Sequence, residues 1–151
     1  VSLPVIAPGT VEECFSATVA AFNWAEKYQG PVVLLTEHSL AERQQNIKRP
    51  DIDDLEIHNR SKYTGDNGYL RYENKTLSPM PIPGSPGSYV ANGSEHDPMG
   101  DTTHLPQRHL EMTNRRFSKL SLLENENYEK YLDGNAPTVV WKMIIPPTKK
   151  I

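Results

Sequence analysis

The sequence lacks any run of apolar residues long enough to cross a bilayer, and its overall apolar content is low. Hydrophobic residues make up 36% of the 151 residues, and the mean hydropathy is −0.61. A membrane-spanning helix needs roughly 20 consecutive apolar residues, and a secretory signal needs a basic stretch followed by an apolar one. Neither pattern occurs, so we expect a cytoplasmic protein.

The sequence also has little charge imbalance and little cysteine. Its 16 basic and 19 acidic residues give a formal net charge of −3, which provides no broad attraction to nucleic acid or to an anionic membrane. The single cysteine, Cys14, cannot form an internal disulfide. It falls on an apolar helical stripe, so we expect a buried free thiol in a reducing compartment. No histidine lies in the same predicted element, which argues against a catalytic thiol.

The clearest pattern of secondary structure lies in the first forty residues. Thr10 and Glu13 have the spacing of a capping box, which predicts a helix that starts after Thr10. Gly30 and Pro31 predict its end, because glycine can take a left-handed conformation and proline cannot continue a helix. The residues that recur at three- and four-residue steps and predict one apolar face are Val11, Cys14, Phe15, Thr18, Val19, Phe22, Ala25 and Tyr28. Trp24 lies beside this face, and we expect it in the core or in an interface.

Short apolar runs flank this helix. They span residues 3–7 before it and residues 32–36 after it, and uninterrupted runs of this kind are typical of strands buried on both faces of a parallel sheet. Strand, helix and strand would form a right-handed βαβ unit. Two parallel strands are not stable alone, because their edges and faces need partners. We therefore expect further strands from this chain, another subunit or another portion of the parent protein, and a homo-oligomer.

The rest of the chain is less regular. Residues 51–57 and 69–73 alternate weakly, with turn residues between them, and predict a hairpin-like excursion of exposed strands or an extended arm. Prolines within residues 79–83 predict an extended path after it. A second helix is predicted from about Leu105 to Leu123. Residues 137–145 have strand character, and no helix follows to cover them.

A loop over residues 84–100 concentrates polar and turn-forming residues without any periodicity that a core would explain. Glu95, His96 and Asp97 are adjacent on it. Such loops usually run over the surface, and ionisable residues on them are better functional candidates than core positions.

The ionisable loop residues allow three interpretations. One is a cation site completed by Asp101, His104 and His109, although the spacing follows no known ligand signature. Another is a structural loop whose side chains cap backbone amides and pair with Arg108 or Arg115 across a domain or subunit junction. The third is contact with a substrate or a neighbouring subunit.

A series of short motifs follows one order along roughly residues 3–125. The motifs are Ala7-Pro8, Val11-Glu-Glu-Cys-Phe15, Ala20-Ala-Phe-Asn23, Ala25-Glu-Lys-Tyr-Gln29, Pro31-Val-Val-Leu-Leu35, Pro83-Gly-Ser-Pro-Gly87, Gly93-Ser-Glu-His-Asp97 with Gly100, Arg108, Met112, Arg115-Arg116 and Lys119-Leu120. In this succession the chain resembles the alpha subunit of 2-oxoacid:ferredoxin oxidoreductases, and within them the 2-oxoglutarate-type branch.

The resemblance implies an enzyme that oxidatively decarboxylates a 2-oxoacid, joins the acyl group to coenzyme A and passes electrons through iron–sulfur clusters to ferredoxin. It implies thiamine diphosphate as the cofactor. The alpha subunit would hold the aminopyrimidine ring, and a beta subunit would hold the diphosphate and its magnesium.

The resemblance also implies a division of the chain. We expect an α/β fold in which residues 1–45 are the C-terminal part of a pyrimidine-binding-type domain with a βαβ unit of a mostly parallel sheet. Residues 46–104 would be a long irregular extension with a hairpin and the glycine-rich loop. Residues 105–151 would contain a helix and the start of a second domain, cut short as after a frameshift or a trimmed gene.

The family residues that assist the cofactor and recognise the substrate carboxylate precede the part that matches Val1. We therefore expect no catalytic residue, no metal ligand and no cofactor bound by this chain alone. The candidate junction or substrate-side residues are Gly93, Glu95, His96, Asp97 and Gly100. The candidate subunit contacts are Arg108, Arg115 and Arg116. The adjacent Arg115 and Arg116 also allow a phosphate contact, although consecutive basic residues on a helix are more often a solvated or salt-bridged face.

Two functions of different classes follow. In the first, the chain is a segment of the alpha subunit and is not catalytic on its own. In the second, it is a non-catalytic remnant that acts as an oligomerisation or subunit-interaction module.

Overall fold

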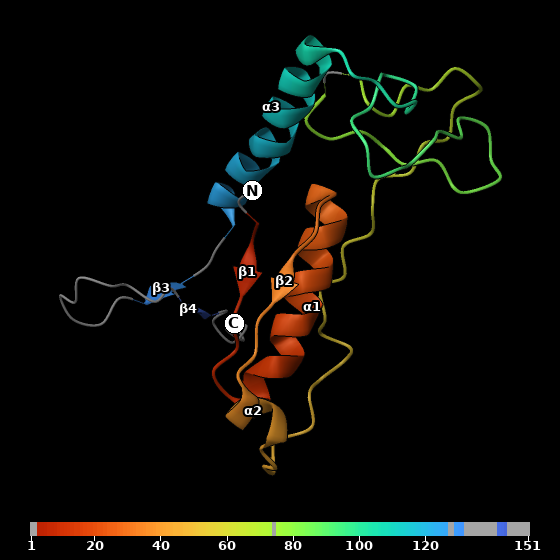
Figure 1. Cartoon of the computed structure of the whole chain (residues 1–151). Coiled ribbons are helices and arrows are strands. Elements are labelled where there is room, and N and C mark those ends of the chain that lie inside the picture. Colours follow the sequence, from red (N-terminus) through yellow and green to blue (C-terminus); the bar gives the residue numbers. More distant parts are fainter. Residues whose placement is uncertain (1–2, 74, 127–128, 132–141, 145–151) are drawn as a thin grey trace.

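The computed structural model describes residues 3–73, 75–126, 129–131 and 142–144 (Figure 1). The predicted βαβ unit is confirmed. β1 (Val5–Ile6) pairs in parallel with β2 (Val33–Leu34). α1 (Val11–Tyr28) connects the two strands and lies alongside them (Figure 1). The fold is therefore an α/β arrangement built on a two-stranded parallel sheet.

The start of α1 follows the predicted cap. The Thr10 side chain accepts a hydrogen bond from Glu13 N at 3.2 Å, and the Glu13 carboxylate accepts one from Gly9 N at 2.7 Å. Two backbone amides at the helix start are thus satisfied by side chains. Cys14 is half-buried rather than buried, and its thiol donates to Thr10 O at 3.3 Å.

The end of α1 differs from the prediction. Gln29, not Gly30, takes the left-handed conformation, with φ 53°. The reason is a set of tertiary contacts. The Gln29 carbonyl accepts a hydrogen bond from Lys119 Nζ at 2.7 Å, and the Gln29 side chain forms hydrogen bonds with residues 71 and 78. These contacts hold Gln29 in the left-handed conformation, which glycine adopts at a lower energetic cost.

The core is small and lies between α1 and the sheet. Its buried members are Ile6, Ala17, Trp24 and Tyr28, with Ala20, Ala21, Val32, Leu122 and Leu123 packed against them. Trp24 is thus a core residue. Glu126 links the segment after α3 to the last turn of α1, because its carboxylate accepts hydrogen bonds from Lys27 Nζ, at 2.6 Å, and from the Tyr28 hydroxyl.

The two strands are not buried on both faces, which corrects the sequence prediction. Val33 and Leu34 are each 37% exposed, Val5 is 40% exposed and Leu35 is 56% exposed. The cause is that α1 covers only one face, and the described residues add no third strand to this sheet. The apolar residues of β1 and β2 therefore remain partly exposed in the described part of the chain.

The segment that follows is irregular. After the short helix α2 (His38–Glu42), residues 43–104 contain no helix or named strand in the part that the structure describes. Of the two alternatives predicted for residues 51–57 and 69–73, the hairpin of strands is wrong, because neither range forms a strand and Tyr72 N donates to Pro98 O. An isolated bridge between Lys62 and Met80 is the nearest feature to strand pairing there.

The predicted second helix is confirmed as α3 (Pro106–Leu122), followed by the 3-10 turn η1 (Leu123–Asn125). The C-terminal end of α3 meets the end of α1, where Lys119 bonds to Gln29 and Leu122 packs against the core. The irregular segment loops out beside the N-terminal end of α3 (Figure 1). β3 (Glu129–Tyr131) pairs antiparallel with β4 (Lys142–Ile144). β4 confirms part of the strand predicted over residues 137–145, whose other residues lie outside the described ones. None of the helices described is both long and apolar enough to cross a membrane.

Candidate functional site

Asp97 organises the loop predicted to carry function. One carboxylate oxygen, Oδ1, accepts hydrogen bonds from the amides of Met99, Gly100 and Asp101 at 2.8, 2.9 and 3.0 Å. Gly100 completes the turn with φ 100°, and a Cβ there would lie 2.2 Å from Val90 O. The predicted capping of backbone amides by the loop carboxylates is therefore observed at Asp97, and the glycine is required by a close approach of backbone.

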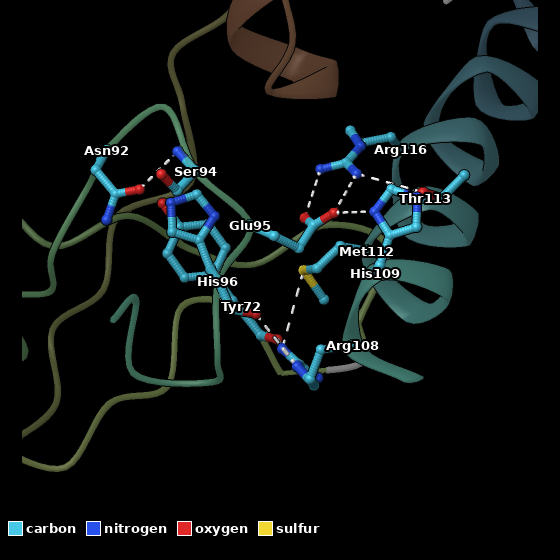
Figure 2. A network of polar contacts seen from close by, with 10 residues as sticks. All are labelled: Tyr72, Asn92, Ser94, Glu95, His96, Arg108, His109, Met112, Thr113 and Arg116. Carbon is cyan, nitrogen blue, oxygen red and sulfur yellow. Dashed lines mark hydrogen bonds and ion pairs between the residues drawn. The ribbon is translucent and has the colours of Figure 1, made fainter. Parts of the chain in front are cut away.

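Glu95 joins the loop to α3 (Figure 2). Its carboxylate accepts two hydrogen bonds from the Arg116 guanidinium at 3.0 Å each and lies 2.7 Å from His109 Nδ1. The side chain is 16% exposed. Arg116, and then His109, hold the pKa of Glu95 below its ordinary range against the opposing effect of burial. The partner is Arg116 rather than the predicted Arg108 or Arg115, because Arg116 is on the α3 face towards Glu95.

His96 forms an aromatic stack and no ion pair among the described residues. It stacks on Tyr72, with ring centroids 4.2 Å apart and an interplanar angle of 1° (Figure 2). Its Nε2 atom is buried and has no hydrogen-bond partner in the structure. Burial raises the pKa of the Tyr72 phenol, and the Arg115 guanidinium lies 5.7 Å from the Tyr72 ring centroid. The outcome is a stack of side chains from three separate parts of the chain.

The other two arginines bind backbone carbonyls. Arg108 donates to Tyr72 O at 2.8 Å and to His96 O at 3.2 Å, and it forms an ion pair with Glu111 at 2.6 Å. Arg115 donates to Lys75 O at 2.7 Å and to the Arg71 carbonyl at 3.3 Å. The structure therefore brings all three arginines onto the irregular segment of the same chain, and their predicted role as subunit contacts stays a prediction.

The residues that sequence reasoning missed are Gln29, Arg71, Tyr72, Ser78 and Lys119. Arg71 and Tyr72 fell in a predicted exposed strand or extended arm, and Lys119 fell only within the Lys119-Leu120 motif. Their partners are far away in sequence, so no periodic signal marks them. Gly93, from the predicted set, lies in open space, because a Cβ added to it would meet no atom within 4 Å.

The described residues do not group into a ligand set for a metal ion or an iron–sulfur cluster. They contain no group of three or more His, Cys, Asp or Glu side chains that could hold a metal ion. His109, one of the alternative cation ligands, instead faces Glu95. An iron–sulfur cluster needs several cysteine thiolates, and the sequence has one cysteine. The described residues thus contain no ligand set for an iron–sulfur cluster, and the resemblance assigns the magnesium to the beta subunit.

Comparison with known proteins agrees with the motif order along the chain. A protein-family model described as "Pyruvate flavodoxin/ferredoxin oxidoreductase, thiamine diP-bdg" matches residues 1–115. The alpha subunit of 2-oxoacid:ferredoxin oxidoreductase 2 from Aeropyrum pernix is 34% identical over 125 residues, which cover 80% of this chain and 19% of that protein. The 2-oxoglutarate synthase subunit KorA from Methanocaldococcus jannaschii is 28% identical over 122 residues, which cover 80% of this chain and 33% of that protein.

A solved structure gives the same result. The 2-oxoglutarate:ferredoxin oxidoreductase from Magnetococcus marinus, with 2-oxoglutarate, coenzyme A and succinyl-CoA bound, aligns with a TM-score of 0.75 and 39% identity. The alignment covers 87% of this chain and 24% of that one. The chain thus spans between a fifth and a third of the length of these relatives. It belongs to the pyruvate flavodoxin/ferredoxin oxidoreductase family, in its thiamine diphosphate-binding part, and is homologous to a segment of the alpha subunit of 2-oxoacid:ferredoxin oxidoreductases.

Proposed function

We propose that the chain is a segment of the alpha subunit of a 2-oxoglutarate-type 2-oxoacid:ferredoxin oxidoreductase and acts only with the rest of the enzyme. The observation that supports this most is the shared fold and sequence with the 2-oxoglutarate:ferredoxin oxidoreductase structure. The intact enzyme would decarboxylate a 2-oxoacid, transfer the acyl group to coenzyme A and reduce ferredoxin. A beta subunit and ferredoxin would be its partners.

Within this proposal the described residues position the chain rather than react. Glu95, His96 and Asp97 fix the loop, and the arginines of α3 hold it by its carbonyls and by the Glu95 carboxylate. This arrangement makes the loop and α3 one unit, as a junction between parts of an enzyme requires. Thiamine diphosphate would supply the carbanion chemistry, and no step of it is assigned to a side chain of this chain.

A segment exchange tests the proposal. The part of the Magnetococcus marinus enzyme that aligns with this chain would be replaced by residues 3–126 of this chain, and 2-oxoglutarate- and coenzyme A-dependent reduction of ferredoxin would be measured. We expect an assembled chimera with activity within about tenfold of the parent, since a shared fold preserves the geometry that catalysis needs. A matched chimera that carries Arg116→Met should assemble less well. A chimera that assembles fully but shows no activity would overturn the proposal.

A second candidate function is assembly without catalysis. The observation that favours it is the uncovered apolar surface of the two-stranded sheet, on which Leu35 is 56% and Val5 is 40% exposed. Large exposed apolar side chains on a small core mark a surface that another polypeptide covers. A homodimer through this surface would shelter the open sheet.

Light scattering distinguishes a self-associating chain from a monomer. We expect the chain to associate at micromolar concentration and Leu35→Lys to shift it towards the monomer, because a charge cannot be buried in an apolar contact. Ile52→Lys is the matched control, since Ile52 is 64% exposed on the irregular segment. A wild-type monomer with cooperative unfolding would remove this candidate.

A further inference from the structure

Three cationic side chains converge near the end of α1. Arg71 is 4% exposed, and its Nη1 donates to Gln29 Oε1 at 3.0 Å and to Ser78 O at 2.9 Å. Lys119 Nζ donates to Gln29 O at 2.7 Å. Arg115 Nη2 donates to the Arg71 carbonyl at 3.3 Å. Every acceptor in this cluster is neutral.

The cluster is not balanced by acidic groups. Three other arginines that contact the same segments have carboxylate partners: Arg60 pairs with Glu26, Arg108 with Glu111 and Arg116 with Glu95.

By contrast, Arg71, Arg115 and Lys119 form no ion pair with any carboxylate in the described ranges. Burying like charges together without a counter-ion is costly, and truncated or unpaired buried charges are among the least favourable features of a fold.

The proton affinity of the cluster reflects this imbalance. Burial, and then the neighbouring positive charges of Arg115, Arg71 and Arg116, together lower the pKa of Lys119 to about 8. Burial and then Arg71 also lower the pKa of Arg115. A negative group placed among these side chains would reverse both effects, because an opposite charge favours the charged form of a base.

Ser78 supplies an independent observation beside the cations. It is 3% exposed, and its hydroxyl is buried without a hydrogen-bond partner. Buried hydroxyl groups nearly always find a partner. Ser78 lies directly against Arg71, because its carbonyl accepts a hydrogen bond from Arg71 Nη1 at 2.9 Å. An unused donor next to unbalanced cations is what an absent anionic group would leave.

A purely structural role explains only part of this arrangement. Lys119 lies at the C-terminal end of α1, where the helix dipole contributes roughly half a negative charge. That partial charge and the neutral carbonyls do not offset three full positive charges.

We propose that Arg71, Arg115 and Lys119, with the hydroxyl of Ser78 beside them, form a binding site for an oxyanion, either a phosphate group or a carboxylate. Guanidinium groups suit both, since their planar donors match the oxygens of each. The proposal does not depend on the activity proposed above. It also gives Arg115 the phosphate-type contact that the sequence allowed.

Calorimetric titration of the whole chain tests the site. Inorganic phosphate, pyrophosphate and glutarate would be added separately at constant ionic strength and pH 7. We expect saturable binding of at least one probe. Binding of the phosphates alone or of glutarate alone identifies the source of the oxyanion, and saturable binding of neither class at millimolar concentrations overturns the proposal.

Variants locate the binding. Lys119→Met should weaken it by about tenfold or more, because a charge-assisted hydrogen bond is lost, while Lys119→Arg should retain most of it. Lys48→Met, in the exposed part of the irregular segment, is the matched control and should change nothing. Equal weakening in Lys119→Met and Lys48→Met would show general charge attraction and reject the site.

The pH dependence of the wild type needs no variant. From about pH 7 to about pH 9.5 Lys119 loses its proton, so glutarate, whose own charge stays constant over this range, should bind more weakly. Unchanged affinity for glutarate, if it is the probe that binds, would exclude Lys119 from the site. If the phosphates bind instead, their negative charge rises with pH, so a weaker affinity at high pH supports Lys119, and the Lys119→Met variant decides whether Lys119 is excluded.

Discussion

Gln29 combines a backbone conformation that favours glycine with side-chain bonds that glycine could not make. Its φ is 53°, and its amide group bonds to Arg71 and to both backbone groups of Ser78. The chain therefore accepts local strain to fasten the end of α1 to the irregular segment. A pair of substitutions separates these two effects.

Gln29→Ala should destabilise the fold by about 2 kcal/mol, because it removes the amide bonds and retains the strained backbone. Gln29→Gly should cost about 1 kcal/mol less, because glycine adopts the left-handed conformation without steric penalty. Urea unfolding of both variants measures the difference, with Gln44→Ala on the exposed segment as the control. Equal stability of the two variants would mean that the backbone of Gln29 stores no strain.

Glu95 makes the loop sensitive to acid. Its pKa is lowered in the folded state, so the ion pair stabilises the fold above the ordinary pKa of 4.5 and is lost as pH falls through the lowered value. Glu95→Gln should therefore cost about 1 to 2 kcal/mol at neutral pH and clearly less near about pH 3. Urea unfolding at both pH values checks this. The exposed Glu124→Gln is the control, and a cost of Glu95→Gln that does not change with pH would contradict the role of the ion pair.

At the scale of elements, the part of the fold that sequence predicted is the part that local interactions determine. Thr10 and Glu13 lie within one helical turn, so their spacing was enough to place the start of α1. The end of α1 depends on Lys119, which is 90 residues away. The hairpin prediction failed for the same reason, since Tyr72 N bonds to Pro98 O rather than to a neighbouring strand.

The cap of α1 can be tested alone. Thr10→Ala should destabilise the chain by about 1 kcal/mol, because the amide of Glu13 loses its acceptor. Thr64→Ala, at an exposed position of the irregular segment, is the matched control. Thermal unfolding followed by helical circular dichroism measures both, and the two variants should differ in midpoint. A Thr10→Ala protein as stable as its control would show that the Glu13 carboxylate is sufficient at the helix start.

At the scale of the whole molecule, the site is a junction between segments far apart in sequence. Glu95 and Asp97 were identified because three ionisable residues in a glycine-rich loop stand out by composition. Tyr72 and Arg71 were not, because their role depends on α3, whose Arg108 and Arg115 reach back over more than thirty residues to their carbonyls. Sequence could identify the loop, but it could not identify which arginine meets which oxygen.

Cofactor binding is also a property of the whole molecule. The chain with thiamine diphosphate and magnesium added together should give no saturable heat in calorimetry beyond that of either one alone, because no group of metal-binding side chains exists among the described residues and a cofactor site needs the cation of the diphosphate held. Magnesium alone and thiamine diphosphate alone are the controls for heats of dilution. A measurable, saturable heat that requires both would show that the chain contains a cofactor site by itself.

The hydrogen bonds between α3 and the irregular segment also determine where this segment could gain residues during evolution. The carbonyls of Arg71, Tyr72, Lys75 and His96 are held by arginines of α3, so an added residue close to any of them would displace a bond. Gly84 is exposed and has no atom near its Cβ position, and exposed turns of this kind are where insertions are best tolerated. Descendants of this chain could lengthen the segment at Gly84 while keeping the attachment to α3 unchanged.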